Sequence, residues 1–126
     1  MTTRFLTPQE LLQVAQTLPG DPACRDLGIL DAACARAQAR YMGQDVYGSL
    51  WLKAAAMLDT IVLHEPLEEK NHFFAWLCAE TFLATNAVHL NYDPREALAL
   101  VLRVKHKGVD LREVSVQLRA WTIPAP

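Results

Sequence analysis

The sequence predicts an all-α fold, a compact bundle of about six helices in a single domain that spans residues 1–126. Helix-capping residues recur along the chain, and the apolar residues between them repeat at the three- and four-residue spacing of helices. No stretch shows the sustained alternation that is typical of a strand. With 52% hydrophobic and 21% charged residues, the chain is too apolar to be disordered and long enough to bury a core.

The first two helices are predicted from their caps. Thr7, Pro8 and Glu10 have the spacing of a capping box with proline in the first helical position, and residues 18–20 end that helix. A polar link containing a proline follows. The second helix is expected from Asp26 to about residue 37.

Two strongly apolar helices are expected at the centre of the bundle. Ser49 caps the first, which should end at residue 63 or 64 because Pro66 disfavours helical geometry in the residue before it. The second begins at Asn71, and Asn86 is expected to end it in a left-handed conformation.

Several side chains of the central region are assigned structural roles. Lys53 is expected to be a surface or helix-end cation, and Cys78 to be a packed thiol. Residues 43–48 are expected to form a loop. The aromatic residues of the second central helix are expected to fill the core rather than to bind a cofactor: Phe73, Phe74, Trp76 and Phe82.

The last two helices are predicted from repeated caps. Asp93 precedes a proline and a glutamate, and its helix should run to about residue 106, where Gly108 stops it. Asp110 caps a short final helix that ends near residue 120. The sequence leaves open whether the tail beyond it packs on the bundle or on a neighbouring molecule.

Charge and composition argue against two kinds of partner. The net charge of −2 lacks the basic excess of nucleic-acid binders, so no nucleic acid is expected. No run approaches the ~18 apolar residues of a membrane span, so no membrane is expected either. Three cysteines without a C-x-x-C pair, and an N-terminus without a signal-like apolar segment, indicate a reduced, cytoplasmic protein.

Several segments, taken in order, resemble the Doc-type members of the Fic family, the death-on-curing toxins. Residues 24–33 (CRDLGILDAA) resemble the family segment R-D-x-G-L-L-E-x-A. Weaker matches follow at residues 35–38, 47, 52–58 and 82–86. The resemblance extends from about residue 6 to residue 118 and implies the all-α Fic fold.

The family signature H-P-F-x-D/E-G-N-K-R is rewritten here within HEPLEEKNHFF, residues 64–74. Anchored on Asn71 and on the Ala-Trp pair that follows, the alignment keeps an acid, Glu69, in the acidic position. It replaces the histidine by Glu65, the glycine by Lys70, the lysine by His72 and the arginine by Phe73. An insertion of one residue after His64 would let both ends match, and the sequence leaves this open.

The resemblance implies a nucleotide held at a helix N-terminus and the transfer of AMP or phosphate to a protein hydroxyl. In such a site backbone N–H groups and an arginine bind phosphate, an acid holds Mg²⁺ and a histidine accepts the proton. Loss of the arginine contact should cost about 1.5–3 kcal/mol. Glu65 adds a negative charge beside any phosphate. We therefore expect no ordinary transfer of AMP or phosphate, and we assign no cofactor.

The favoured hypothesis is a repurposed acid/base enzyme that acts on a small molecule. Glu65, with a pKa raised by apolar surroundings, would be the general base, and His64 or His72 the acid or the clamp on the substrate. The substrate-binding residues would be Glu69, Lys70 and Asn71. No metal site is expected, because Pro66 interrupts the helix that a zinc-binding face would need.

Two alternatives remain open. One is a non-catalytic protein whose groove binds a peptide or protein partner, as toxin relatives bind antitoxin segments. The other is a Doc-like toxin that transfers phosphate or AMP to a protein hydroxyl. Stabilisation by Mg-ATP would favour the second of these.

Overall fold

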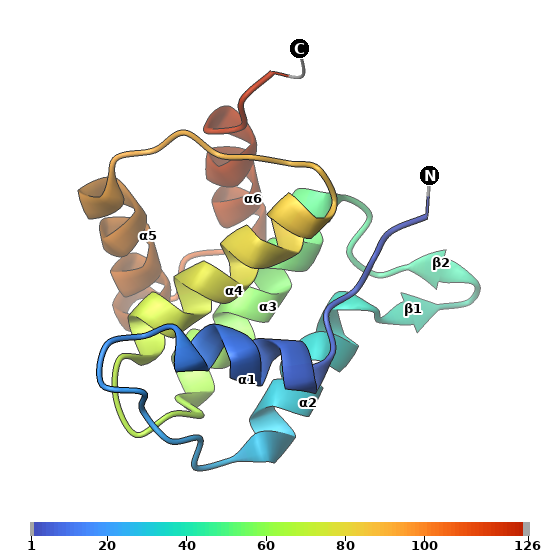
Figure 1. Ribbon diagram of the computed structural model, residues 1–126. Coiled ribbons are helices and arrows are strands. Elements are labelled where there is room, and N and C mark those ends of the chain that lie inside the picture. The colour runs from blue at the N-terminus through green and yellow to red at the C-terminus, as the bar shows by residue number, and fades with distance from the viewer. Residues whose placement is uncertain (1, 125–126) are drawn as a thin grey trace.

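The computed structural model describes residues 2–124, which form six α-helices and one short hairpin (Figure 1) and so confirm the all-α prediction. The elements are α1 (Pro8–Gln16), α2 (Leu27–Ala37), β1 (Arg40–Tyr41), β2 (Gln44–Asp45), α3 (Leu50–His64), α4 (Asn71–Thr85), α5 (Pro94–Lys107) and α6 (Leu111–Ala120). Within residues 2–124 no helix is long and apolar enough to cross a bilayer.

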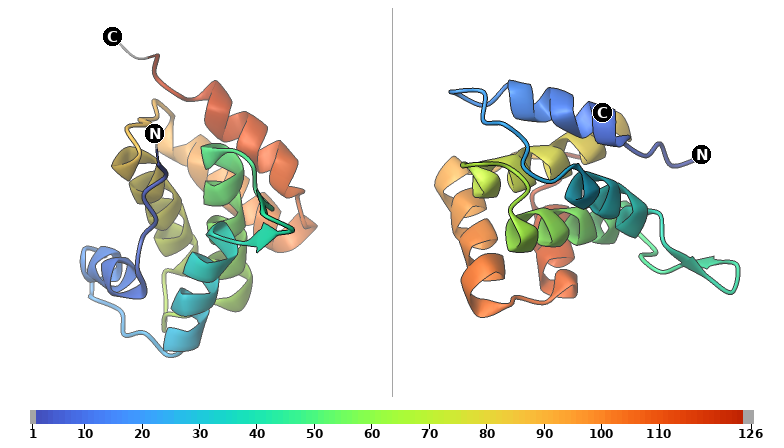
Figure 2. Two further views of the ribbon diagram at one scale, coloured as in Figure 1. Left: turned by 90° about the vertical axis from the view of Figure 1, so that its right-hand side faces the viewer. Right: turned by 90° about the horizontal axis from the view of Figure 1, so that it is seen from below.

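Helix α3 is the centre of the bundle. Helices α2, α4, α5 and α6 all pack against it, and the views in Figure 2 show them arranged around it. Every residue of α3 from Lys53 to Leu58 is buried, which explains why the helix is apolar on nearly all sides. The prediction that this helix is central is confirmed.

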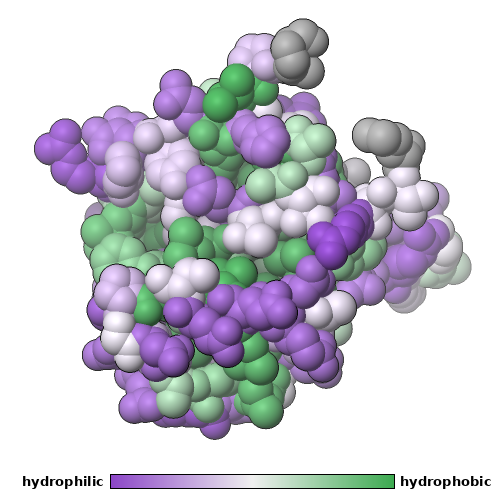
Figure 3. Space-filling model, viewed as in Figure 1, coloured by the Kyte–Doolittle hydropathy of each residue, from purple (hydrophilic) through white to green (hydrophobic). Residues whose placement is uncertain are grey.

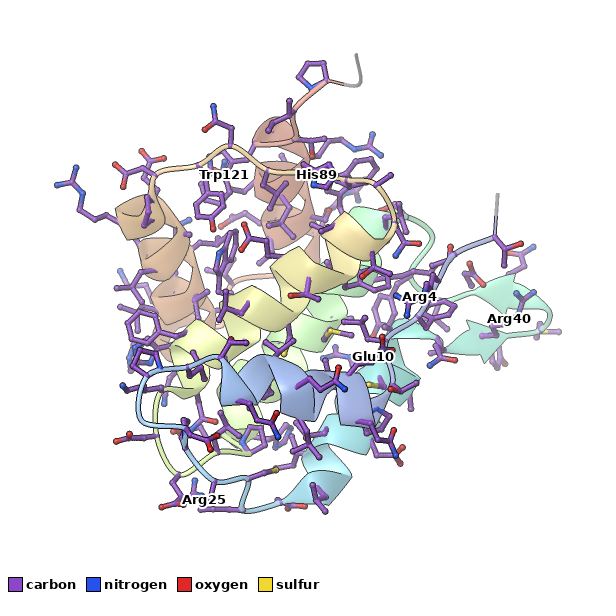
Figure 4. All side chains as sticks on the ribbon, viewed as in Figure 1. Arg4, Glu10, Arg25, Arg40, His89 and Trp121 are labelled. Atoms are coloured by element: carbon purple, nitrogen blue, oxygen red, sulfur yellow. The ribbon has the colours of Figure 1, made fainter. Side chains whose placement is uncertain are left out.

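The predicted caps are present. The Thr7 hydroxyl accepts a hydrogen bond from the Glu10 N–H at 3.2 Å, and the Glu10 carboxylate accepts one from the Thr7 N–H at 3.0 Å. The Arg4 guanidinium also pairs with Glu10 at 2.8 Å (Figure 4). Asp26, Ser49, Asp93 and Asp110 cap the helices that follow them. Local sequence therefore determines where five of the six described helices begin.

The predicted end of α4 is wrong in its detail. Asn86 has a φ of −102°, and the left-handed residue is Ala87, with a φ of +62°. The Asn86 side chain is occupied instead with the N-terminal segment: its amide donates to the Arg4 carbonyl at 2.9 Å and its oxygen accepts from the Arg4 N–H at 2.8 Å. This tertiary contact decides the conformation of Asn86.

The hairpin corrects two sequence-based expectations. Strand residues Gln44 and Asp45 fall within the segment that was expected to be a loop, and Met42 and Gly43 form the two-residue turn with positive φ values of 52° and 80°. Lys53 is not a surface cation. It is buried, and its ammonium donates to the Asp45 carboxylate at 3.0 Å and to the Tyr47 carbonyl.

The C-terminal tail packs on the bundle. The Trp121 ring lies 5.9 Å from Trp76 and 6.0 Å from Tyr92 between ring centroids, and it is labelled in Figure 4. The Thr122 hydroxyl accepts a hydrogen bond from the Trp51 indole at 2.9 Å. These contacts settle the alternative that the sequence left open.

The buried thiols have packing roles. Cys34 and Cys78 are both in the core. Burial raises the pKa of Cys34 to about 11 and that of Cys78 well above its usual range. The packing role expected for Cys78 is confirmed.

Candidate functional site

The candidate site is the loop between α3 and α4, residues 65–70, which carries the rewritten signature. Its two ends are left-handed: Glu65 ends α3 with a φ of +47°, and Lys70 precedes α4 with a φ of +63°. This conformation costs an ordinary residue about 1–2 kcal/mol and costs glycine almost nothing. Lys70 occupies the position where the resembled family has glycine, so the loop keeps the backbone conformation that glycine favours.

We expect Lys70→Gly to be more stable than Lys70→Ala by about 1 kcal/mol. Both variants lose the hydrogen bond, 2.8 Å long, of the Lys70 ammonium to the Pro19 carbonyl. The difference between their free energies of unfolding therefore measures the cost of the left-handed conformation at residue 70. Urea denaturation of the two variants measures it. The same pair at Glu68, which lacks a positive φ, is the control, and there glycine should be no better than alanine.

Asn71 holds the loop closed. Its side-chain oxygen accepts a hydrogen bond from the Leu67 N–H at 2.8 Å, and its amide donates to the Leu67 carbonyl at 3.0 Å. Both residues are buried. The structure thus gives Asn71 a positioning role, because the backbone of the loop engages its side chain, and the substrate-binding role expected for Asn71 stays a prediction.

The segment before α2 forms hydrogen bonds with the backbone of the loop, and we call these bonds the outer clamp. The Arg25 N–H donates to the Pro66 carbonyl at 2.7 Å, and the Glu68 N–H donates to the Ala23 carbonyl at 3.0 Å. The Arg25 guanidinium, labelled in Figure 4, also donates to the Glu65 carbonyl at 3.0 Å. The segment that resembles the family's R-D-x-G stretch thus positions the signature loop through its backbone.

The pKa expected for Glu65 is wrong. A hydrogen bond and the positive charge of Lys105, 2.9 Å away on α5, lower the pKa of Glu65, and Arg25 and His72 lower it further. The sequence could not reveal this pairing because Lys105 lies 40 residues further along the chain. A carboxylate with a lowered pKa is a weaker base than the one the favoured hypothesis requires.

The pairing predicts a pH dependence of stability. Because folding lowers the pKa of Glu65 below its ordinary value of 4.5, its contribution is complete above that pH and is lost as the pH falls through the folded pKa. Lys105→Met should therefore destabilise the protein at pH 7 but much less at pH 3. Urea denaturation at the two pH values tests this, with exposed Lys107→Met as the control. An equal loss at both pH values would contradict the pairing.

The other titratable groups of the loop are not gathered around one point. His64, Glu68 and Glu69 are exposed, whereas His72 is half-buried. Of the three expected catalytic residues, the structure brings Glu65 and His72 close enough to interact and leaves His64 at the surface. Within residues 2–124 no three histidine, cysteine or acidic side chains are placed to hold a metal ion.

Two apolar pockets lie beside the loop and share Phe73 and Trp76, and together we call them the apolar groove. Its first part, about 260 Å³, lies between α4 and α5, and its second part, also about 260 Å³, lies between α4 and the end of α1. Phe73 and Trp76 line both parts, and His72 lines the first. Figure 3 shows hydrophobic residues exposed among hydrophilic ones on the face that carries α1, α4 and α5. Phe73 is 46% exposed, so its predicted place in the core is wrong.

The floor of the groove is built from aromatic rings that pack against one another. The Trp76 indole donates a hydrogen bond to the Tyr92 hydroxyl at 3.1 Å, and the two rings lie edge to face with centroids 4.9 Å apart. Trp121 packs against both rings. Sequence reasoning missed Tyr92 and Trp121, because both come from segments with no motif and meet Trp76 only in the folded chain.

No family model matches the chain, but one curated protein does. The protein named Toxin Doc from Mycolicibacterium smegmatis (strain ATCC 700084 / mc(2)155) is 35% identical over 126 residues, which cover 98% of this chain and 97% of that protein. The chain belongs to the Doc family. The resemblance found in the sequence is therefore confirmed.

In the alignment on Asn71, several side chains of the loop differ from the resembled signature, and the backbone of the loop is held by contacts from other parts of the chain. The left-handed residue before α4, the buried asparagine and the outer clamp are all present. The expected phosphate-binding arginine is Phe73, and the expected base is Glu65, which is held by Lys105. This arrangement holds the loop in shape and leaves the Phe73 ring exposed beside it.

Proposed function

We propose that this Doc-family chain is a toxin-module protein that acts by binding a protein partner in the apolar groove, without transferring AMP or phosphate. The observation that carries the proposal is Phe73. Where the resembled signature has an arginine, this chain presents an aromatic ring that is 46% exposed and lines both parts of the groove. The toxin role is proposed from the name of the M. smegmatis relative.

The local charges argue against a bound nucleotide. Phe73 has no donor for a phosphate oxygen, and the Glu65 carboxylate repels one. The lysine that replaces glycine is turned to the Pro19 carbonyl. A triphosphate at this loop would therefore lack its usual cationic contacts.

The groove favours a protein partner. Its first part is walled almost entirely by apolar atoms, and each part is smaller than the ~300–1,000 Å³ typical of ligand sites. Two neighbouring apolar pockets that share Phe73 and Trp76 fit two apolar side chains of a partner segment.

A repurposed acid/base enzyme remains the second candidate. It is favoured by His72, which lines the first part of the groove and lies near enough to Glu65 to affect its pKa. In such an enzyme the imidazole of His72 would exchange a proton with a small molecule in the groove, and Glu65 would orient the imidazole. The low pKa of Glu65 makes this the weaker of the two proposals.

The experiment measures three things: binding of Mg-ATP, transfer of AMP or phosphate to a protein, and growth of a bacterial host that expresses the chain. We expect millimolar Mg-ATP to leave the melting temperature unchanged, and ATP labelled at the α- or γ-phosphate to label no protein. Expression in a bacterial host should slow growth, and Glu69→Ala and His72→Ala should retain this effect. Phe73→Asp should abolish it, whereas Leu27→Asp, which changes another exposed apolar side chain outside the groove, should not.

Each part of the proposal can fail separately. A melting shift with Mg-ATP, or labelled protein, would overturn the absence of transfer. Growth that is unaffected by the wild-type chain would overturn the toxin role. Loss of the growth effect in His72→Ala, with Phe73→Asp still active, would favour the second candidate.

A further inference from the structure

A second groove lies at the other end of α3, roughly 20 Å from the signature loop along the helix axis. It has a volume of about 610 Å³ and is bounded by the segment that follows β2, the first turn of α3 and one face of α6. Figure 2 shows this segment and α6 on the same side of α3. We call it the arginine groove and define it by Tyr47, Trp51, Leu52, Arg112, Val116 and Arg119.

We propose that the arginine groove binds an acidic segment of a protein partner, with two carboxylates on either side of an apolar side chain. This site is independent of the apolar groove and of the function proposed above. It shares no lining residue with the apolar groove.

The spacing of its charges comes from α6. Arg112 and Arg119 are seven residues apart, so they lie on one face of the helix, two turns and about 10 Å from each other. Val116 lies between them and is 62% exposed, although its face of α6 adjoins the groove. The helix therefore presents a positive charge, an apolar side chain and a second positive charge in line.

Both guanidinium groups are unpaired. Among residues 2–124 neither forms an ion pair or a side-chain hydrogen bond. The Arg119 guanidinium stacks over the Trp51 ring at 4.0 Å from its centroid, which orders the group and leaves its N–H donors available. Asp110 is the one acid that lines the groove, and its carboxylate caps α6 through the Arg112 N–H at 2.6 Å.

These features favour a carboxylate-bearing segment. Arginine binds carboxylates through paired N–H donors, and the apolar surface of Trp51, Leu52 and Val116 suits an aliphatic or aromatic side chain between them. Acids three residues apart in a segment of polyproline II conformation lie on one face and about 9 Å from each other, which matches the arginines. A nucleic acid is disfavoured, because the chain as a whole carries a net charge of −2.

The test uses a capped, fluorescein-labelled peptide with the core sequence Glu-Leu-Leu-Glu and the full chain. We expect saturable binding by fluorescence anisotropy, and binding that is at least roughly tenfold weaker when glutamine replaces both glutamates. Arg112→Glu should weaken binding by a similar factor, and Val116→Asp should weaken it too. Both positions are exposed, so the variants should fold as the wild type does.

The control is Arg103→Glu, which reverses an exposed charge on α5 outside the groove and should leave binding unchanged. The proposal is overturned if the glutamate peptide does not bind, if the glutamine peptide binds as well, or if Arg112→Glu has no effect. Tighter binding of a labelled single-stranded DNA than of the peptide, lost in Arg112→Glu, would also overturn it in favour of a nucleic acid.

Discussion

Replacing Asn71 by leucine is expected to lower the free energy of unfolding by about 2–4 kcal/mol, one of the largest effects of any single change in the loop. The buried amide makes two hydrogen bonds to the backbone of Leu67, at 2.8 and 3.0 Å. Leucine has a similar volume and makes neither bond. The N–H and carbonyl of Leu67 would then be buried without partners, and the loop could not close in its present form.

Urea denaturation followed by circular dichroism measures the loss. Glu69→Leu is the matched control, because it places the same side chain at an exposed position of the loop and should change stability by less than about 0.5 kcal/mol. If the two variants were equally stable, Asn71 would not hold the loop, and its role in binding a substrate would deserve a new test.

Restoring the family signature is expected to create a nucleotide site. A variant with Glu65→His, Lys70→Gly, His72→Lys and Phe73→Arg regains the resembled base, glycine, lysine and arginine, while Glu69 and Asn71 stay in place. The loop already has the required left-handed residue before α4, so we expect the new side chains to complete a phosphate cradle. Mg-ATP at about 100 times its Kd should then stabilise the variant by about 2.7 kcal/mol.

Differential scanning fluorimetry with and without Mg-ATP provides the measurement, and the wild type should show no shift. The variant that lacks only the arginine change, with Phe73 retained, separates the contribution of that residue and should show little or no shift. If the full variant gains no affinity, the framework of the loop differs from a phosphate cradle, and the alignment on Asn71 has to be revised.

Most of the helix boundaries were predictable because a cap is a local interaction. Thr7, Asp26, Ser49 and Asp110 each bond to a backbone N–H two or three residues ahead, so the partner is already specified by the spacing. Pro66 likewise acts on its immediate neighbour, and α3 ends at His64 as expected. The start of α4 is the exception, since it has no side-chain cap.

The candidate site was predictable in position and not in chemistry. The alignment on Asn71 identified the loop, and the left-handed Lys70 agrees with it. The state of Glu65 depends on Lys105, which α5 brings to the loop, and the exposure of Phe73 depends on a groove that α4 forms with α1 and α5. The burial of Lys53 depends in the same way on Asp45 of the hairpin.

By itself the sequence determined the helical class, most of the helix limits and the family of this protein, since each rests on residues close together in the chain or on their order along it. Only the tertiary structure decided which charges are paired, which aromatic ring is exposed and where the two grooves lie. Those properties arise between segments that are distant in sequence, where the electrostatic and packing energies are set by three-dimensional neighbours that no local pattern specifies.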